Sequence, residues 1–182
     1  MFIPDLTTTW NVNIKSDDID EAIETIQSSP ILSVAGDDVL QRLTNAKAEL
    51  EGLSTPVAQA LAETQQSYQE QYIEMNTSID TGLMHDTITI EDGGEGVRTV
   101  GPTAYSLEGF PYPLCIENGS KSHWVAPKTA KALHWIQDGE HMFSKGHMVS
   151  GIKARPFVEP SQSSTMDDVE RIVEETLGNI FR

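Results

Sequence analysis

The chain has 182 residues and a mass of 20.0 kDa, enough for a domain with its own hydrophobic core and no disulfide or metal to support it. Twelve Lys and Arg residues against 28 Asp and Glu give a formal net charge of −16, which disfavours binding to duplex nucleic acid. The single cysteine, Cys115, excludes an internal disulfide and fits a reducing compartment, and the sequence predicts neither a membrane span nor a signal peptide.

The first half of the chain predicts one strand and three helices. Trp10–Ile14 alternates apolar and polar residues with the two-residue period of a half-buried strand. Three amphipathic patterns follow: Asp17–Gln27, Asp37–Gly52, and a longer helix that opens at Pro56 and carries a stripe of Val57, Leu61, Tyr68, Tyr72, Met75 and Ile79. The stripe thins at Gln65 and Gln66, and so narrow a stripe is typical of a helix that packs on a sheet and leaves its other side to solvent or to a neighbouring subunit.

After Gly82 the pattern changes to a period of two, which predicts antiparallel strands. Thr87–Ile90 and Val97–Thr99 flank a glycine-rich turn and form a hairpin. The remaining expected elements are strands at Leu114–Glu117, Ala132–Ile136 and His141–Phe143, and a C-terminal helix that begins at Ser164 or Thr165 and carries Val169, Ile172, Val173, Leu177 and Ile180. This order predicts an α+β domain: an antiparallel sheet packed by a long helix, with a C-terminal helix and additional N-terminal helices.

Gly93, Gly94 and Gly96 resemble a phosphate-binding loop in composition. Such a loop follows a strand and opens a helix, whereas acidic residues surround this run and a strand follows it. We interpret it as the tip of the hairpin. The chain contains no Gly-x-Ser-x-Gly motif, and the adjacent Ser122 and His123 do not make a catalytic triad by being neighbours in sequence.

Four histidines in the second half of the chain are weak candidates for a metal site: His123, His134, His141 and His147. Strand histidines can hold zinc. No two of these four, however, have the i,i+2 or i,i+4 spacing that places two ligands on one face of an element. We therefore expect separate hairpin and loop histidines, and neither a metal nor another cofactor.

Two stretches of sequence are more specific than these motifs. The first is DTGLMHDTITI at Asp80–Ile90, and the second begins at Tyr112 and runs through Ile116–Ile136 to Gly151–Ser161. Together they resemble the tail-completion family of long-tailed bacteriophages, also described as tail-component, minor tail or head–tail joining proteins. The matching residues are Asp80, Thr81, Gly82, Thr87, Ile88, Tyr112, Glu117, Gly119, Ser120, His123, Pro127, Lys128, Lys131, Ala132, Leu133, Ala154, Arg155, Pro156 and Phe157.

The chain departs from the family pattern at several positions. Asn118 stands where Phe or Tyr is usual, and Met84 and His85 replace polar or basic residues. The resemblance implies one domain over residues 1–182, in which 31–54 looks like a helical insertion.

The matching residues also have structural roles that their chemistry predicts. We expect Gly82 to end the long helix, Gly119 to turn a strand at a hairpin, and Pro156 to fix the chain where it leaves the sheet. Arg155 offers a planar five-donor side chain, and we expect it to pair with Glu117 or with a carboxylate of an adjacent subunit.

The resemblance implies a structural virion protein and not an enzyme. Members of the family are expected to form a homo-oligomeric ring at the head–tail junction, or neck, after synthesis in the host cytoplasm. The ring would complete the tail, meet the head-side connector or stopper on one side and the tail terminator or tail tube on the other, and let DNA pass without sequence-specific binding. No membrane is involved. Acidic helix faces at Asp17–Glu24 and Asp167–Glu175 would suit a channel wall that does not hold phosphates.

Three other functions are compatible with parts of the sequence. A head-completion (stopper) or tail-terminator ring would need a similar small α+β subunit. A zinc-dependent hydrolase would use the four histidines. An acidic mimic of DNA that inhibits a nuclease fits less well, because the chain has many apolar strand positions.

Overall fold

The computed structural model describes residues 2–28, 37–76, 83–106 and 109–180, which form two compact units. The first unit is Met1–Thr103 with Phe157–Arg182, and the second is Ala104–Pro156. The α+β class predicted from the sequence is confirmed, with small antiparallel sheets, a long helix and C-terminal helices. The single domain expected over residues 1–182 stays a prediction.

The sheet of the first unit has three antiparallel strands in the order β1-β3-β2. Its strands are β1 (Thr8–Asn11), β2 (Ile88–Gly94) and β3 (Val97–Pro102), and a short 3₁₀ helix, η1 (Pro4–Leu6), precedes β1. The hairpin predicted around the glycine run is confirmed as β2–β3, with positive φ angles at Gly94 and Gly96. Strand β1 lies earlier than the predicted Trp10–Ile14, and its last pair joins Asn11 to Val97.

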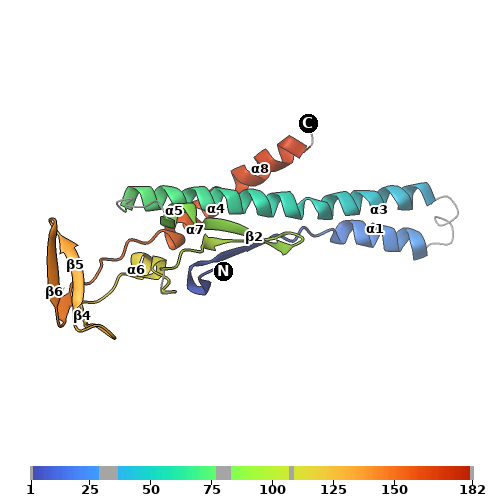
Figure 1. The fold of residues 1–182 in the computed structure, drawn as a ribbon. Helices are drawn as coiled ribbons and strands as arrows, with labels where there is room; N and C mark the ends of the chain where they lie inside the picture. The colour runs from blue at the N-terminus through green and yellow to red at the C-terminus, as the bar shows by residue number, and fades with distance from the viewer. Residues whose placement is uncertain (1, 29–36, 77–82, 107–108, 181–182) are drawn as a thin grey trace. The chain divides into compact units, whose positions relative to one another are not determined.

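The long helix α4 (Ser54–Asn76) packs on this sheet (Figure 1). Its buried residues are Ser54, Val57, Ala58, Leu61, Ala62, Gln65, Gln69 and Ile73. The predicted stripe is therefore wrong in its second half: two glutamines continue the buried face, and Met75 is 70% exposed. Ile79 lies outside the described residues. Gln65 belongs in the core because its amide accepts from Trp10 Nε1 at 2.6 Å and donates to Thr8 Oγ1 at 2.7 Å.

Helices α1 (Asp17–Ser28) and α3 (Asp37–Gly52) form an antiparallel pair and follow the predicted ranges closely. Residues 31–36 of the expected insertion lie outside the described residues. Figure 1 shows α3 running nearly end to end into α4, with α1 alongside α3. Lys47 joins the two helices through an ion pair with Asp20 at 2.5 Å.

The C-terminal region contains two helices where one was predicted. Helix α7 (Val158–Asp167) starts well before Ser164, and α8 (Val169–Ile180) follows after Asp168; both pack against α4. Thr165 does not cap a helix, because it is buried inside α7 and its hydroxyl donates to the Ser161 carbonyl at 2.9 Å. The first unit also contains the short helix α5 (Leu83–Asp86).

The second unit consists of one short helix and two antiparallel ribbons. Its elements are α6 (Pro113–Asn118), β4 (His123–Val125), β5 (Leu133–Gln137), β6 (Glu140–Ser144) and β7 (His147–Val149), with pairing of β4 to β7 and β5 to β6. The strands predicted at Ala132–Ile136 and His141–Phe143 are confirmed. The strand predicted at Leu114–Glu117 is wrong, because Pro113 opens a helical turn there and Gly119 ends it with φ +71°. Gly119 thus ends a helix and does not turn a strand.

Candidate functional site

Two of the segments that resemble tail-completion proteins meet in the second unit, although thirty residues separate them in sequence. We call the contact between 116–120 and 151–155 the motif junction. The Ser120 N–H donates to the Ile152 carbonyl at 2.8 Å, and the Ile152 N–H donates to Ser120 Oγ at 3.1 Å. The Arg155 N–H donates to the Ile116 carbonyl at 2.7 Å. These hydrogen bonds join the segment around α6 to the last residues of the unit.

Two glycines allow the two backbones of the motif junction to approach this closely. A Cβ on Gly119 would lie 2.6 Å from the Ile152 carbonyl oxygen and 2.7 Å from the Ala154 nitrogen. A Cβ on Gly151 would overlap the Ser120 carbonyl oxygen. Because these neighbours are backbone atoms, a side chain at either position would separate the segments.

The other matching residues do not gather around the motif junction. Tyr112 precedes α6, and burial raises the pKa of its phenol. Pro127 and Lys128 lie between β4 and β5, where the lysine is exposed. Pro156 is exposed, whereas Phe157, immediately before α7, is 1% exposed. Asp80, Thr81 and Gly82 lie outside the described residues. The predicted ion pair of Arg155 with Glu117 stays a prediction, because the hydrogen bond that places Arg155 uses its backbone.

Two of the four histidines come together across the β5–β6 ribbon. His134 Nε2 and His141 Nδ1 are 2.7 Å apart, so one ring donates a hydrogen bond to the other, and the rings stack with centroids 5.0 Å apart. His134 also stacks on Phe143, at 4.9 Å. His147 packs separately against Trp135, with ring centroids 5.1 Å apart.

This arrangement does not assemble a metal centre in the part of the chain that the structure describes. There, no group of three or more His, Cys, Asp or Glu side chains is placed to hold a metal ion. His123 hydrogen-bonds through Nδ1 with the Lys121 carbonyl at 3.1 Å. The sequence did contain a signal for the pairing of His134 with His141: a two-residue Asp138-Gly139 turn, with φ +52° and +84°, sets the register of the ribbon.

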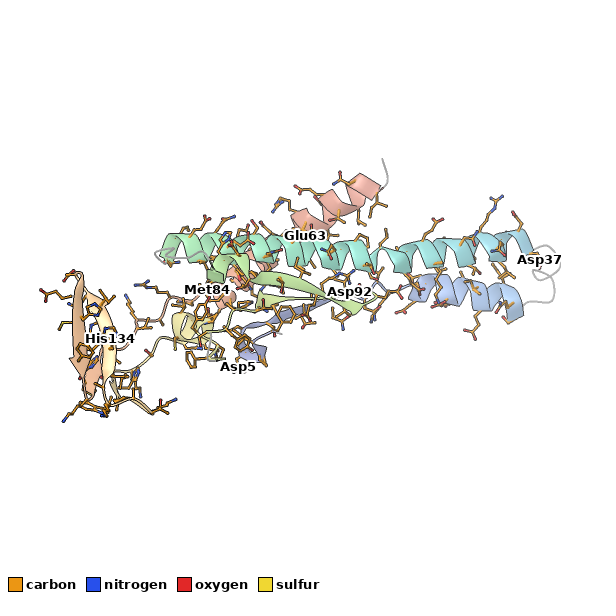
Figure 2. All side chains as sticks on the ribbon, viewed as in Figure 1. Asp5, Asp37, Glu63, Met84, Asp92 and His134 are labelled. Carbon is orange, nitrogen blue, oxygen red and sulfur yellow. The ribbon has the colours of Figure 1, made fainter. Side chains whose placement is uncertain are left out.

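The second unit exposes apolar side chains on the outer faces of both ribbons. In the β5–β6 register, Ile136 lies opposite His141 and His134 lies opposite Phe143, so these four residues share one face. We call it the ribbon face; Figure 2 shows side chains projecting from this part of the chain, with His134 labelled. Ile136 is 64% exposed and Phe143 is 68% exposed. On the β4–β7 ribbon, Trp124 is 62% exposed. Exposed apolar residues grouped in this way are typical of contact surfaces.

The charge of the chain is divided unevenly between its two units. Residues 104–156 contain six of the twelve cations but only four of the 28 carboxylates, a formal charge of +2. The first unit has six cations against 24 carboxylates, a formal charge of −18. The six cations of the second unit are all exposed: Lys121, Lys128, Lys131, Lys145, Lys153 and Arg155. The net charge of the whole chain conceals this division.

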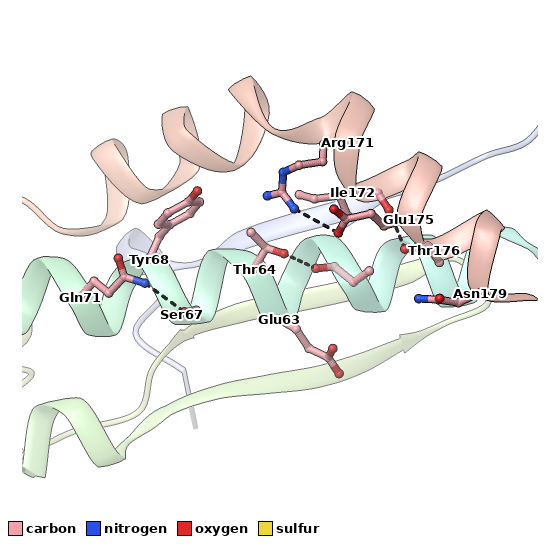
Figure 3. A pocket seen from close by; sticks show the side chains of 11 residues that line it. Glu63, Thr64, Ser67, Tyr68, Gln71, Arg171, Ile172, Glu175, Thr176 and Asn179 are labelled. Atoms are coloured by element: carbon pink, nitrogen blue, oxygen red, sulfur yellow. Dashed lines mark hydrogen bonds and ion pairs between the residues drawn. The ribbon is translucent and has the colours of Figure 1, made fainter.

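The first unit has an open groove of about 440 Å³ between α4 and α8 (Figure 3). Asp168, at the start of α8, accepts from the Tyr68 hydroxyl at 2.7 Å and from Arg171 at 2.6 Å, and Arg171 also pairs with Glu175 at 3.1 Å. The Tyr68 hydroxyl and the guanidinium lower the pKa of Asp168, and the same Asp168 contact raises the pKa of Tyr68. Because these charges satisfy one another, the network joins two helices and does not present a reactive group.

No family model, no curated protein and no solved structure matches this chain. Among the described residues, no helix is both long and apolar enough to cross a membrane. The case for a tail-completion protein therefore depends on the matching residues and on the surfaces of the two units.

Proposed function

We propose that this chain is a structural virion protein of a tailed virus and forms a homo-oligomeric ring at the head–tail junction. The ring completes the tail and docks it to the head-side connector, and its other side meets the tail terminator or tail tube. It acts without a cofactor and without enzymatic activity.

The observation that carries this proposal is the motif junction. Five residues that match the tail-completion pattern belong to segments that the fold joins by hydrogen bonds: Glu117, Gly119, Ser120, Ala154 and Arg155. Gly119, in the first segment of the motif junction, has a backbone conformation and a close neighbour that only glycine accepts without strain. The contact supports the proposal because it gives matching residues of both segments a role at one place in the fold.

The surfaces of the two units support a role in assembly. A ring subunit must bury area against its own copies and against two different neighbours, and the second unit exposes several large apolar side chains. The first unit has a formal charge of −18, which suits a channel that duplex DNA passes without adhering. The run Asp167–Glu175, at the end of α7 and in α8, is exposed at most of its carboxylates and is the candidate for that wall.

The test is electron microscopy of lysates from the parent virus with this gene disrupted. DNA-filled heads beside complete, unattached tails are the expected result, and a plasmid copy of the gene should restore joined particles. Empty heads that have lost their DNA would indicate that the protein acts on the head side, as a stopper. Tails of uncontrolled length would indicate a tail terminator. Normal infectious particles would refute a structural role, and zinc analysis of the purified protein would then test the hydrolase.

A further inference from the structure

We propose that the ribbon face of one copy binds the α1–α3 helix pair of a second copy. The ribbon face consists of His134, Ile136, His141 and Phe143, and the helix pair is Asp17–Ser28 with Asp37–Gly52. This inference rests on the proposed function, because it names the subunit contact from which the ring would be built.

No described element of the second unit itself covers the ribbon face. Ile136 and Phe143 are each about two-thirds exposed, whereas Leu133 and Trp135, which alternate with His134 and Ile136 on β5, are half-buried. One face of the ribbon is thus packed and the other is open. Lys131 and Lys145 flank the open end of the ribbon, since Leu133 pairs with Ser144, whereas Asp138 and Glu140 lie at its turn; all four side chains are exposed, so the cations are confined to the open end.

The α1–α3 pair is the second incompletely buried apolar surface. Both helices are amphipathic, yet neither contains a buried residue in its described range. Ile19, Ile23 and Ile26 remain half-exposed on α1, and Val39 is 46% exposed on α3. Two helices alone cannot bury both of their apolar stripes, so a further layer is needed to complete the packing.

Net charge distinguishes contact between two like surfaces from contact between a ribbon face and a helix pair. The helix pair has nine carboxylates against two cations, and one of the cations, Lys47, is already paired with Asp20. Two helix pairs would repel each other, and so would two second units, each with a formal charge of +2. A basic second unit and an acidic helix pair attract each other, which favours contact between unlike surfaces.

A contact between unlike surfaces has a geometric consequence. Each copy then offers one surface of each kind, so the association is head-to-tail, and it closes into a ring when the rotation between neighbours divides a full turn. Helix α1 would lie in a subunit contact, which leaves the carboxylates of Asp167–Glu175 for the channel wall. The contact should weaken as ionic strength rises, because its charges lie at an exposed rim.

The test uses two variants of the full chain, each defective on one surface. The ribbon variant is Ile136→Asp with Phe143→Asp, and the helix variant is Glu21→Lys with Glu24→Lys. All four replaced side chains are exposed, so the substitutions leave the packed interior unchanged. Sedimentation velocity at low ionic strength and rising protein concentration measures association. We expect the wild type to form species larger than a dimer and each variant alone to have its dissociation constant raised by about 30-fold or more.

A mixture of the two variants gives the decisive result. One intact ribbon face and one intact helix pair remain between them, so an equimolar mixture should form a dimer and nothing larger. The matched controls make equivalent changes of charge at exposed positions of the first unit that lie outside both surfaces. The control for the ribbon variant is Met75→Asp with Met166→Asp, and the control for the helix variant is Glu170→Lys with Glu174→Lys. These controls should associate as the wild type does.

Three results would overturn the inference. The first is a mixture that stays monomeric while the wild type associates, as symmetric pairing or docking within one chain would produce. The second is wild-type association by the ribbon variant alone. The third is a wild type that stays monomeric at every concentration. None of them bears on the lysate experiment, so the proposed function can survive the loss of this contact.

Discussion

The same substitution at two buried glutamines on one face of α4 should change the free energy of unfolding in opposite directions. Gln65 and Gln69 lie one turn apart, and both are 0% exposed. Gln65 hydrogen-bonds to Trp10 and Thr8, whereas neither amide atom of Gln69 has a hydrogen-bond partner in the described structure. Methionine is the matched replacement at both sites, because it is unbranched and similar in length but has no strong hydrogen-bonding group.

Gln65→Met should destabilise the protein. The change leaves the Trp10 indole N–H without an acceptor and removes the donor to the Thr8 hydroxyl, and both residues are only 8% exposed. Leaving a buried polar group unsatisfied costs about 1–3 kcal/mol, so the two together should lower the free energy of unfolding by about 3 kcal/mol. For a chain of this length that corresponds to a fall in Tm of roughly 6–12 °C.

Gln69→Met should have the opposite sign. It removes a buried amide whose desolvation is uncompensated among the described residues, and we expect a gain of about 1 kcal/mol. Urea denaturation followed by far-UV circular dichroism measures both changes, because α4 contributes strongly to that signal. Equal losses at both sites would refute the reasoning. Adding Trp10→Phe to Gln65→Met should recover part of the loss, since it removes the orphaned donor.

Two further predictions concern the α4–α8 network and the motif junction. The lowered pKa of Asp168 contributes stability that is present above the unfolded pKa of about 3.9 and lost as pH falls through the folded value, so the Tm difference between wild type and Asp168→Asn should narrow as the pH falls below about 4. The raised pKa of Tyr68 acts in the other direction: the difference between wild type and Tyr68→Phe should narrow as pH rises above about 10. Gly119→Ala should accelerate amide exchange at Arg155 far more than Gly139→Ala does, because both glycines have positive φ but only Gly119 has backbone atoms where a Cβ would be; equal effects would count against the motif junction.

Local patterns in the sequence predicted much of the fold. The helical spacing of isoleucines and leucines identified α1 and α3, and alternation identified β2, β3, β5 and β6. The wrong predictions of secondary structure lie in short segments, where the residues that flank the segment favour a different structure from the residues inside it. Leu114–Glu117 contains residues that favour a strand, but a proline before it and a glycine after it frame one helical turn. At the C-terminus, Ser164 and Thr165 are residue types that favour a helix N-cap, but both lie inside α7.

Other features depend on contacts that no local pattern contains. The inward position of Gln65 follows from the need of Trp10 Nε1 for an acceptor, and these residues are 55 positions apart. The proximity of His134 and His141 is a different case, because the local Asp138-Gly139 turn sets the register of the ribbon and could have predicted it. The division of charge between the units required a boundary that only the three-dimensional structure supplied.

The motif junction also closes a loop within the second unit. The segments 116–120 and 151–155 share backbone hydrogen bonds, so the ends of the stretch between 120 and 151 are held together whatever the length of that stretch. Lengthening such a loop costs little free energy, about 0.6 kcal/mol per doubling. Evolution could therefore exchange or enlarge the ribbons, and with them the apolar surface that they expose, without displacing the two segments that hold them.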